Sequence, residues 1–475
     1  MEEHGKKLNL WNIIGLGLGG AIGTGIFVLL GSGIAYTGRS IMLVVAVGCF
    51  FMLLAYWYNL AMPNMFVLKG GDYSMKTMLF NLLMSGVGAW MTVVGAFAMS
   101  SYAVAIADYL SIAVPALAGH QSLVAFVVMT LFFATTIRGS RFLTLIENLV
   151  TVVLVAALAL FVAFGVPKVD PVSFFSNADG GFFHGGFGGF VAAIAVMGWA
   201  CQGTTMGPIS MAAVTKNPKR TIPLAIVLIT VILAVIYAAM AYVAGGVLPY
   251  EQVAATNISV TAEAIFPKPL YMFFVVGGGI GAIASSLLGG LGTMRYPLMQ
   301  VANDGWLPAI FKKTTKSGYP YWCYLVFYLI SVFPILTGMG LDAVVSQVMI
   351  PTMLMNIYMN LACISLPKKY PAQWAKRSLK MPLWLYNVCC VLGALCAGVV
   401  AYNLFVELTL NDAIVCVVII ALMLGLSALR LKQGAVRTED LAAKKQAIID
   451  EALADTDEGE AAQEEDVYEE QKLSA

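Results

Sequence analysis

GGAIGTGIF, residues 19–27, lies in the middle of the first apolar segment of this 475-residue chain. The segment carries no charged side chain between Lys7 and Arg39, which is enough chain to cross a lipid bilayer as a helix. Its glycines make a continuous helix costly, because glycine loses more backbone freedom than any other residue when it becomes helical. A helix that breaks inside hydrocarbon leaves amide and carbonyl groups without partners, unless the break faces a cavity in the protein. The stretch therefore predicts a broken membrane helix beside a binding site.

The same feature recurs in the second half of the chain. Gly203-Thr204-Thr205 echoes Gly23-Thr24-Gly25 and lies in an apolar span that glycines interrupt between Gly198 and Gly207. Paired interrupted helices in corresponding halves mark the substrate site of inverted-repeat transporters. We therefore expect the two breaks to meet near the middle of the bilayer.

Composition places the rest of the chain in the membrane. Hydrophobic residues make up 60% of the chain and charged residues 11%, and the mean hydropathy is +0.84, which excludes an ordinary soluble protein. We predict an all-α integral membrane protein with twelve transmembrane helices, of which helices 1 and 6 are broken. The expected spans are 10–36, 41–67, 84–112, 122–137, 142–165, 187–211, 221–247, 269–295, 321–338, 343–366, 384–406 and 412–431. Because five is odd, spans 6–10 must be inverted relative to spans 1–5.

The predicted organisation has five parts. They are a cytoplasmic N-terminus (1–9), a first five-helix repeat (10–165), an inverted second repeat (187–366), helices 11 and 12 (384–431) and an acidic cytoplasmic tail (432–475). Of the 27 lysines and arginines, only Arg39, Lys168 and Lys268 fall on the side opposite the termini. By the positive-inside rule, both termini of this multi-pass protein lie in the cytoplasm. The basic residues are spread over short loops, where they would meet anionic membrane lipids, and they form no nucleic-acid footprint.

Other chemistries find no support in the sequence. GLGLGG, residues 15–20, matches a dinucleotide-binding pattern but has no polar βαβ context, so its glycines fit close helix packing better. The three histidines lie outside the spans without metal-ligand spacing, and the eight cysteines form no disulfide or metal motif. There is no Walker A pattern. We therefore expect no enzymatic activity, no cofactor and no bound metal.

Two broken helices supply what a zwitterion needs. The half-helix that starts at a break presents free N–H groups, and the half-helix that ends there presents free carbonyls. A carboxylate would bind the amides of Thr24 and Gly25 and the Thr24 hydroxyl. An ammonium group would bind carbonyls near Ile22, Trp199 and Gln202. Each charge-assisted hydrogen bond would contribute about 1–3 kcal/mol.

Four motifs together resemble the amino acid-polyamine-organocation (APC) superfamily. They are GGAIGTGIF in span 1, KGGDY (69–73) after span 2, KNPKRTIP (216–223) after span 6 and ANDGWLP (302–308) after span 8. The resemblance covers residues 8–431. It implies the five-plus-five inverted repeat of the bacterial leucine transporter with two extra helices. It also implies alternating access to a site between spans 1, 3, 6, 8 and 10.

The resemblance also implies roles for particular residues. Gly23, Thr24 and Gly25 match the carboxylate-binding glycine motif of the family. The run WACQGTT (199–205) is similar to the arginine/agmatine antiporter, which has a gate tryptophan four residues before a glycine, so Trp199 is a candidate lid over the substrate. Thr205 stands where that antiporter has an acid, which favours neutral substrates. The remaining positions aligned with the substrate pocket or its gate are Met99, Ser100, Gly203, Thr204 and Leu291.

Coupling to an ion is predicted from three further residues. Ser285 and Ser286 lie where sodium-coupled relatives place hydroxyl ligands, although helix–helix hydrogen bonding would also account for them. Glu147 is an intramembrane carboxylate, a group that often carries protons, although its depth near a span end also suits an interface partner. The lysine that replaces sodium in some proton-coupled relatives has no counterpart here, because the region around Val153 and Leu154 is apolar.

The predicted function is secondary active transport of L-amino acids, most of all neutral ones, across the cytoplasmic membrane. The protein would work by alternating access as a symporter or an exchanger. Its partners would be an amino acid substrate, membrane lipids and a coupling ion, H⁺ or Na⁺. A cationic amino acid or polyamine exchanger and a non-transporting amino acid sensor are the alternatives.

Overall fold

The computed structural model describes residues 7–137, 140–176, 181–315 and 318–453, apart from the side chains of Thr24, Thr293 and residues 140–149. The regular structure in these ranges is helical, with one isolated β-bridge between Leu8 and Thr215. The first half contains α1 (Leu10–Ala21), α2 (Thr24–Val28), α3 (Leu30–Thr37), α4 (Ile41–Ala55), α5 (Tyr58–Ala61), α6 (Gly71–Leu79), α7 (Leu82–Val94), α8 (Phe97–Ala113), α9 (Gln121–Thr136), α10 (Ser140–Gly165) and α11 (Pro171–Phe174).

The second half begins with α12 (Gly186–Cys201), α13 (Gly203–Ser210), α14 (Pro218–Gly246), α15 (Tyr250–Val253), α16 (Ser259–Ile265) and α17 (Lys268–Phe273). A π-helical segment (Phe274–Ile280) then leads into α18 (Gly281–Thr293) and α19 (Arg295–Asn303). The chain continues through α20 (Tyr321–Leu336), α21 (Leu341–Cys363), α22 (Leu366–Lys369), α23 (Pro371–Ala375), α24 (Leu383–Val406) and α25 (Leu410–Lys432). Residues 438–453 form one more helix, which we call the C-terminal helix.

Ten helical segments of the described chain are long and apolar enough to cross a membrane, and two more apolar helices are shorter. The short ones are α9 and α20, which correspond to the predicted spans 122–137 and 321–338. Each has 16 residues, so each is about 24 Å long against a hydrocarbon core of about 30 Å. The structure therefore shows about ten candidate spans where the sequence predicted twelve.

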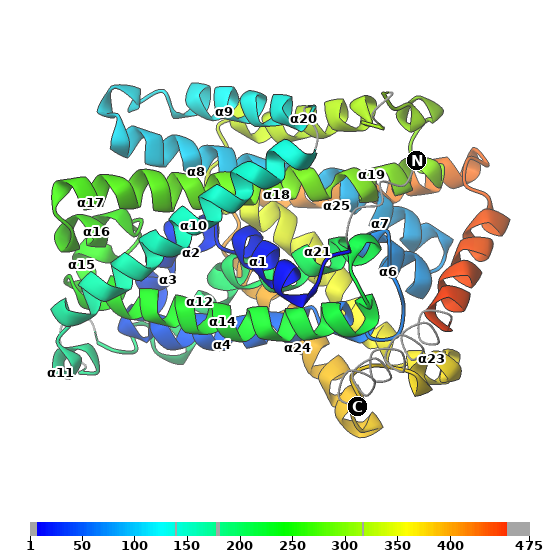
Figure 1. Ribbon diagram of the computed structural model, residues 1–475, viewed down its shortest axis with the longest axis horizontal. Helices are drawn as coiled ribbons and strands as arrows, with labels where there is room; N and C mark the ends of the chain where they lie inside the picture. Colours follow the sequence, from blue (N-terminus) through cyan, green and yellow to red (C-terminus); the bar gives the residue numbers. More distant parts are fainter. Residues whose placement is uncertain (1–6, 138–139, 177–180, 316–317, 454–475) are drawn as a thin grey trace, which may run out of the picture.

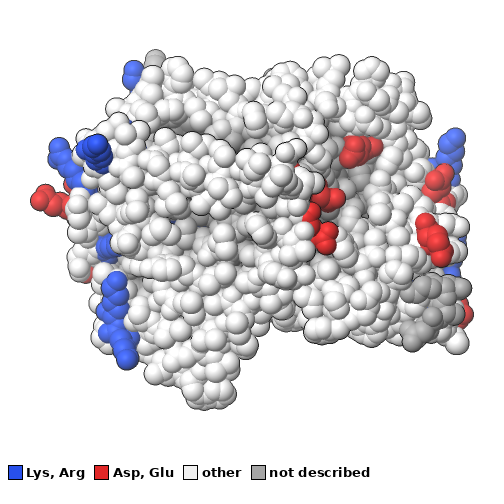
Figure 2. All heavy atoms as spheres, turned by 180° about the vertical axis from the view of Figure 1, so that it is seen from behind, with Lys and Arg blue, Asp and Glu red and all other residues white. Residues whose placement is uncertain are grey.

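The long helices lie side by side, and α6, α19 and α23 lie together at one end of them (Figure 1). We call this end the α6 end, and the opposite end, with α15, α16 and α17, the α16 end. Figure 2 shows one face with its lysines and arginines near the two ends and some acidic side chains part-way in from one end; a broad uncharged band covers the rest. Such a band is what a membrane-embedded surface requires, because charged groups are costly in hydrocarbon.

The first predicted break is present. Helix α1 ends at Ala21 and α2 begins at Thr24, because Ile22 is extended (φ −85°, ψ 104°) and Gly23 has φ −157° and ψ −134°. The second interruption is milder than expected. Gln202 alone separates α12 from α13, and it keeps helical dihedral angles of φ −77° and ψ −20°. Its carbonyl accepts the amide of Thr205 at 3.3 Å, so the turn tightens instead of opening.

A third interruption, between α4 and α5, was not predicted. The amide of Asn360 repairs it, because Nδ2 donates to the carbonyl of Ala55 at 2.9 Å and Oδ1 accepts the backbone amide of Tyr58 at 3.1 Å. Asn360 belongs to α21 and is fully buried. One side chain thus satisfies both backbone groups that the interrupted helix leaves open.

Candidate functional site

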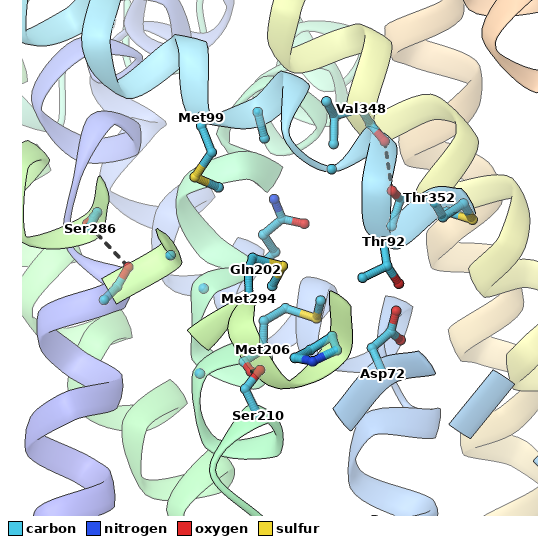
Figure 3. Close-up of a pocket in the computed structure, with 18 of the residues that line it drawn as sticks. Asp72, Thr92, Met99, Gln202, Met206, Ser210, Ser286, Met294, Val348 and Thr352 are labelled. Atoms are coloured by element: carbon cyan, nitrogen blue, oxygen red, sulfur yellow. Dashed lines mark hydrogen bonds between the residues drawn. The ribbon is translucent and has the colours of Figure 1, made fainter. Parts of the chain in front are cut away.

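A cavity of about 460 Å³ lies beside the first break and extends toward the α6 end. Its walls come from α1, α2, α5, α6, α7, α8, α12, α13, α18, α19, α21 and α25. Figure 3 shows some of the side chains that line it. The lining residues that define the site are Gly23, Gly25, Tyr56, Tyr58, Asp72, Tyr73, Lys76, Met99, Tyr102, Trp199, Gln202, Gly203 and Ser286. The volume falls within the range of about 300–1,000 Å³ that is typical of small-molecule sites.

The two interrupted helices pack against each other at the cavity. A Cβ atom on Gly25 would collide with the backbone of Ala200, and a Cβ on Gly203 would lie 2.8 Å from Cα of Ala21. Gly25, after the first break, therefore packs against Ala200 near the end of α12. Gly203, after the second interruption, packs against Ala21 at the end of α1. Only glycine allows the two backbones to approach this closely.

Side chains of neighbouring helices hold the first break in place. The hydroxyl of Ser286 donates to the carbonyls of Gly20 at 3.3 Å and Ile22 at 3.2 Å. The hydroxyl of Tyr237, from α14, donates to the carbonyl of Ala21 at 3.2 Å. These bonds replace the helical partners that the carbonyls lose, which is how the protein tolerates a break in an apolar segment.

An aromatic pair lies beside the break. The rings of Tyr102 and Trp199 have centroids 6.3 Å apart, and both residues line the cavity. Tyr102 also lies close to Gly23, since a Cβ there would be 3.7 Å from its ring. The two rings, one from α8 and one from α12, are therefore neighbours on the cavity wall next to the first break.

A polar network lies behind Gln202. Its Oε1 accepts a 2.5 Å hydrogen bond from the hydroxyl of Tyr56, and its backbone carbonyl also accepts the hydroxyl of Thr205 at 3.3 Å. Thr205 in turn accepts Nδ2 of Asn59 at 3.1 Å. The network ties the second interruption to the end of α4 and to α5, and it fixes the Gln202 amide at the cavity wall (Figure 3).

The sequence is similar to known transport proteins along most of its length. Residues 8–429 match the family profile described as amino acid permease. The chain belongs to the amino acid permease family. Branched-chain amino acid permease BcaP of Bacillus subtilis is 24% identical over 395 residues, which cover 77% of this chain and 82% of BcaP. The probable threonine/serine transporter YbxG of the same organism is 25% identical over 75% of this chain and 77% of YbxG.

A third relative, histidine permease HisP of Lactococcus lactis, is 25% identical over 70% of this chain and 73% of its own length. These names describe proteins that carry different amino acids. They support a general role of this permease in amino acid transport, and they agree with a chain built of many apolar helices.

Two charged residues lie on the cavity wall of this permease, and both were missed as site residues from the sequence. Asp72 and Lys76 form an ion pair one turn apart on α6, and the hydroxyl of Tyr58 donates to Asp72 at 3.1 Å. Among the described residues that line the cavity, only these two are charged. Asp72 belongs to the KGGDY motif, so a signal existed, but only the tertiary structure brings α6 to the cavity.

The structure separates the predicted site residues into two groups. Gly23, Gly25, Met99, Trp199, Gln202, Gly203 and Ser286 line the cavity. Five others are buried but do not line it: Ile22, Ser100, Thr204, Ser285 and Leu291. The Ser100 hydroxyl donates to the Phe97 carbonyl at 2.7 Å, and the Leu291 carbonyl accepts the Tyr324 hydroxyl at 2.5 Å. The side chains of Thr24 and Glu147 lie outside the described residues.

The predicted ion-coupling serines differ in their surroundings. Ser286 is bonded to the carbonyls of α1, whereas the buried hydroxyl of Ser285 has no hydrogen-bond partner among the described residues. A Cβ on Gly19 would lie 3.0 Å from Oγ1 of Thr151 and 3.8 Å from Oγ of Ser285, so both hydroxyls flank α1 just before the break. Thr151, from α10, was not singled out from the sequence.

Proposed function

We propose that this permease carries neutral L-amino acids across the cytoplasmic membrane by alternating access. In this proposal the twelve predicted spans form two inverted five-helix repeats plus two helices, and both termini are cytoplasmic. The observation that carries the proposal is the reciprocal packing of Gly25 on Ala200 and Gly203 on Ala21 beside a cavity. Crossed, interrupted helices at the centre of such repeats are where transporters of this architecture bind substrate.

The amino acid backbone is placed at the first break. The carboxylate binds the amides of Thr24 and Gly25 and the Thr24 hydroxyl, because the start of α2 offers N–H groups. The ammonium group binds near the end of α1, where carbonyls already accept the Ser286 and Tyr237 hydroxyls. Trp199 with Tyr102 forms the lid over this position.

The charges on the cavity wall favour a substrate with a neutral side chain. Asp72 and Lys76 compensate each other, so the cavity offers no net charge to a cationic or anionic side chain. Burying an unpaired charge costs several kcal/mol or shifts its protonation, which disfavours a charged side chain here. Thr205 in place of an acid supports the same conclusion.

The conformation faces the cytoplasm in this proposal. The cavity reaches α6 through Asp72, Tyr73 and Lys76, and α6 follows span 2, whose end the positive-inside rule places in the cytoplasm. The aromatic pair of Tyr102 and Trp199, both on the cavity wall, is the proposed gate toward the α16 end. Ser285 and Ser286 are the proposed sodium ligands, and Glu147 is the proposed proton carrier, for a symporter or exchanger.

Uptake into proteoliposomes tests the proposal. The purified protein is given a panel of radiolabelled amino acids with and without sodium and proton gradients, and saturable uptake of neutral amino acids is expected. Preference for lysine, arginine or polyamines would replace it with the cationic exchanger. Thermal stabilisation by amino acids without any flux would replace it with the sensor.

The Thr24→Val variant tests the backbone site. It should weaken substrate binding roughly tenfold or more, because one charge-assisted hydrogen bond contributes about 1–3 kcal/mol. Thr337→Val is the matched control, since the Thr337 hydroxyl donates to its own helix at the end of α20, away from the cavity. Equal affinity in the two variants would contradict the role of Thr24.

A further inference from the structure

Seven methionines lie among the residues that line the cavity. They come from α7, α8, α13, α21 and α25 and from the ends of α13 and α18: Met91, Met99, Met206, Met211, Met294, Met349 and Met423. Figure 3 shows Met99, Met206 and Met294 around Gln202, between the break and α6. Residues far apart in the sequence thus place their thioethers around one space.

A thioether wall has a definite physical character. Methionine is unbranched and polarisable, so it adapts to different shapes, and its sulfur contacts aromatic rings with about 0.3–1.5 kcal/mol of stabilisation. Branched aliphatic walls are stiffer and select one shape. Met-rich surfaces are accordingly used where one site accepts several partners.

The methionines lie where a substrate side chain would extend. Tyr102 adjoins Gly23 at the break, and Met99 lies three residues earlier on α8, about one turn nearer the α6 end. The tip of Met99 adjoins Gly290, where a Cβ would lie 3.2 Å from its sulfur. The sulfur of Met206 is held by Asn59, whose Nδ2 donates to it at 3.6 Å.

We propose that this permease takes amino acids with large apolar side chains, whether branched, thioether or aromatic, and discriminates little among them. The inference rests on the proposed function, because it assumes that the amino acid backbone binds at the first break. Small or hydroxylated side chains would leave the thioether wall without contacts and would therefore bind more weakly.

Competition for uptake tests the inference on the full-length protein in proteoliposomes. Leucine, methionine and phenylalanine should inhibit uptake of a labelled substrate with similar half-inhibitory concentrations. These concentrations should be roughly tenfold or more lower than those of glycine, alanine and serine. A single preferred side chain, or a preference for the small ones, would overturn the inference while leaving amino acid transport intact. Absence of any amino acid uptake would instead overturn the proposed function.

A second test replaces one wall methionine with a stiffer side chain and measures the affinity for phenylalanine relative to leucine. Met99→Ile keeps an apolar side chain but fixes its shape, so phenylalanine should lose affinity relative to leucine by about fivefold or more. Met359→Ile is the matched control, because Met359 is equally apolar and fully buried but does not line the cavity. Detergent melting curves establish that both variants fold. An unchanged phenylalanine-to-leucine ratio in folded Met99→Ile would contradict the inference.

A separate observation concerns the C-terminal helix, which crosses the α6 end. Lys444 forms an ion pair with Asp304 after α19, Glu451 pairs with Lys69 before α6, and Lys445 Nζ donates to the carbonyl of Phe80 at 3.2 Å. Two further bonds reach α23 and α14: Gln373 Nε2 donates to the carbonyl of Ile449 at 3.2 Å, and Lys219 donates to the carbonyl of Ala452.

A chain of polar contacts connects this helix with the cavity. Asp304, whose other oxygen accepts the Tyr73 hydroxyl at 2.7 Å, is nearly buried beneath Lys444. Trp306 Nε1 donates to the same hydroxyl at 2.8 Å, and Tyr73 lines the cavity. Burial and the nearby Asp304 carboxylate raise the pKa of Tyr73 well above its ordinary value, so its hydroxyl keeps the proton that it donates.

We infer that the C-terminal helix is a latch on the transport cycle. It joins α6 and α19, which both contribute to the cavity wall, to the start of α14. These segments must move relative to one another when the α6 end closes, so contacts that bridge them stabilise this conformation and slow its conversion.

Exchange kinetics test the latch in the full-length protein. Lys444→Gln should raise the maximal exchange rate about twofold or more while the substrate KM stays nearly the same. Glu439→Gln is the matched control, because Glu439 is an exposed residue of the same helix. Asp304→Asn should also raise the maximal exchange rate. The double variant should be no faster than either single variant, since both substitutions remove the same Lys444–Asp304 ion pair. The latch would be overturned if the exchange rate of either single variant fell or equalled that of the wild type, or if the two increases added up in the double variant.

Discussion

Gly25 of α2 lies directly against the backbone of Ala200 near the end of α12, with no space for a methyl group between them. The reciprocal contact joins Gly203 of α13 to Ala21 of α1. Because each contact links one interrupted helix to the other, these two pairs of residues set the geometry of the whole site. The proposed positions of the substrate, the lid and the ion ligands all depend on this crossing.

Gly25→Ala should therefore destabilise the protein. The added Cβ overlaps backbone atoms that no rotamer change can move, and overpacking of this kind costs about 1–3 kcal/mol. The melting temperature in detergent and the yield of monodisperse protein measure the effect. Gly15→Ala is the control, because a Cβ on Gly15 meets no atom within 4 Å and alanine is the better helix former. Equal melting temperatures for the two variants would contradict the crossing.

Ser286→Ala should separate support of the break from ion coupling. Loss of the hydrogen bonds to the carbonyls of Gly20 and Ile22 should lower stability by about 1–3 kcal/mol, because those carbonyls become unpaired. If Ser286 also binds sodium, uptake in the variant loses its dependence on sodium. A variant that keeps the wild-type sodium dependence would assign Ser286 to helix support alone. Ser111→Ala, near the C-terminal end of α8, is the control, because the Ser111 hydroxyl donates to a carbonyl of its own helix.

Asn360→Leu should be among the most damaging substitutions away from the cavity. It leaves the carbonyl of Ala55 and the amide of Tyr58 buried without partners, at about 1–3 kcal/mol each. Thermal unfolding in detergent is the measurement. Asn403→Leu provides the comparison, because the Asn403 side chain donates only within its own helix and is partly exposed. A small effect at Asn360 would mean that water replaces its amide.

Tyr56→Phe should reduce transport more than stability. The Tyr56 hydroxyl holds Oε1 of Gln202 at the cavity wall, and without it the Gln202 amide is free to rotate. We expect uptake to fall about fivefold or more, while the buried ring keeps its packing. Uptake kinetics alongside a melting curve distinguish the two effects. Unchanged uptake would remove Gln202 from the site.

The sequence predicted the first break at the correct residues, because clustered glycines weaken an apolar helix at a definite place along the chain. The strength of the second interruption was not predictable. Gln202 stays helical since Thr205 satisfies its carbonyl with both an amide and a hydroxyl, a local detail that glycine content does not reveal. The interruption before α5 carries no glycine signal, because Asn360, some 300 residues away, repairs it.

Composition and the spacing of charges determined that this chain is a helical membrane protein. Long apolar runs in hydrocarbon pair their backbone groups within helices, and charges are driven toward the ends of the spans. The glycine clusters likewise placed the first break, beside which the cavity lies. Tertiary structure alone decided which side chains face the cavity, and so brought Asp72, Lys76, Tyr102 and the methionines together. Apolar helices carry little information about which face meets which neighbour, since lipid and protein interior are similarly apolar. That choice depends on close packing between distant segments, such as Gly25 on Ala200.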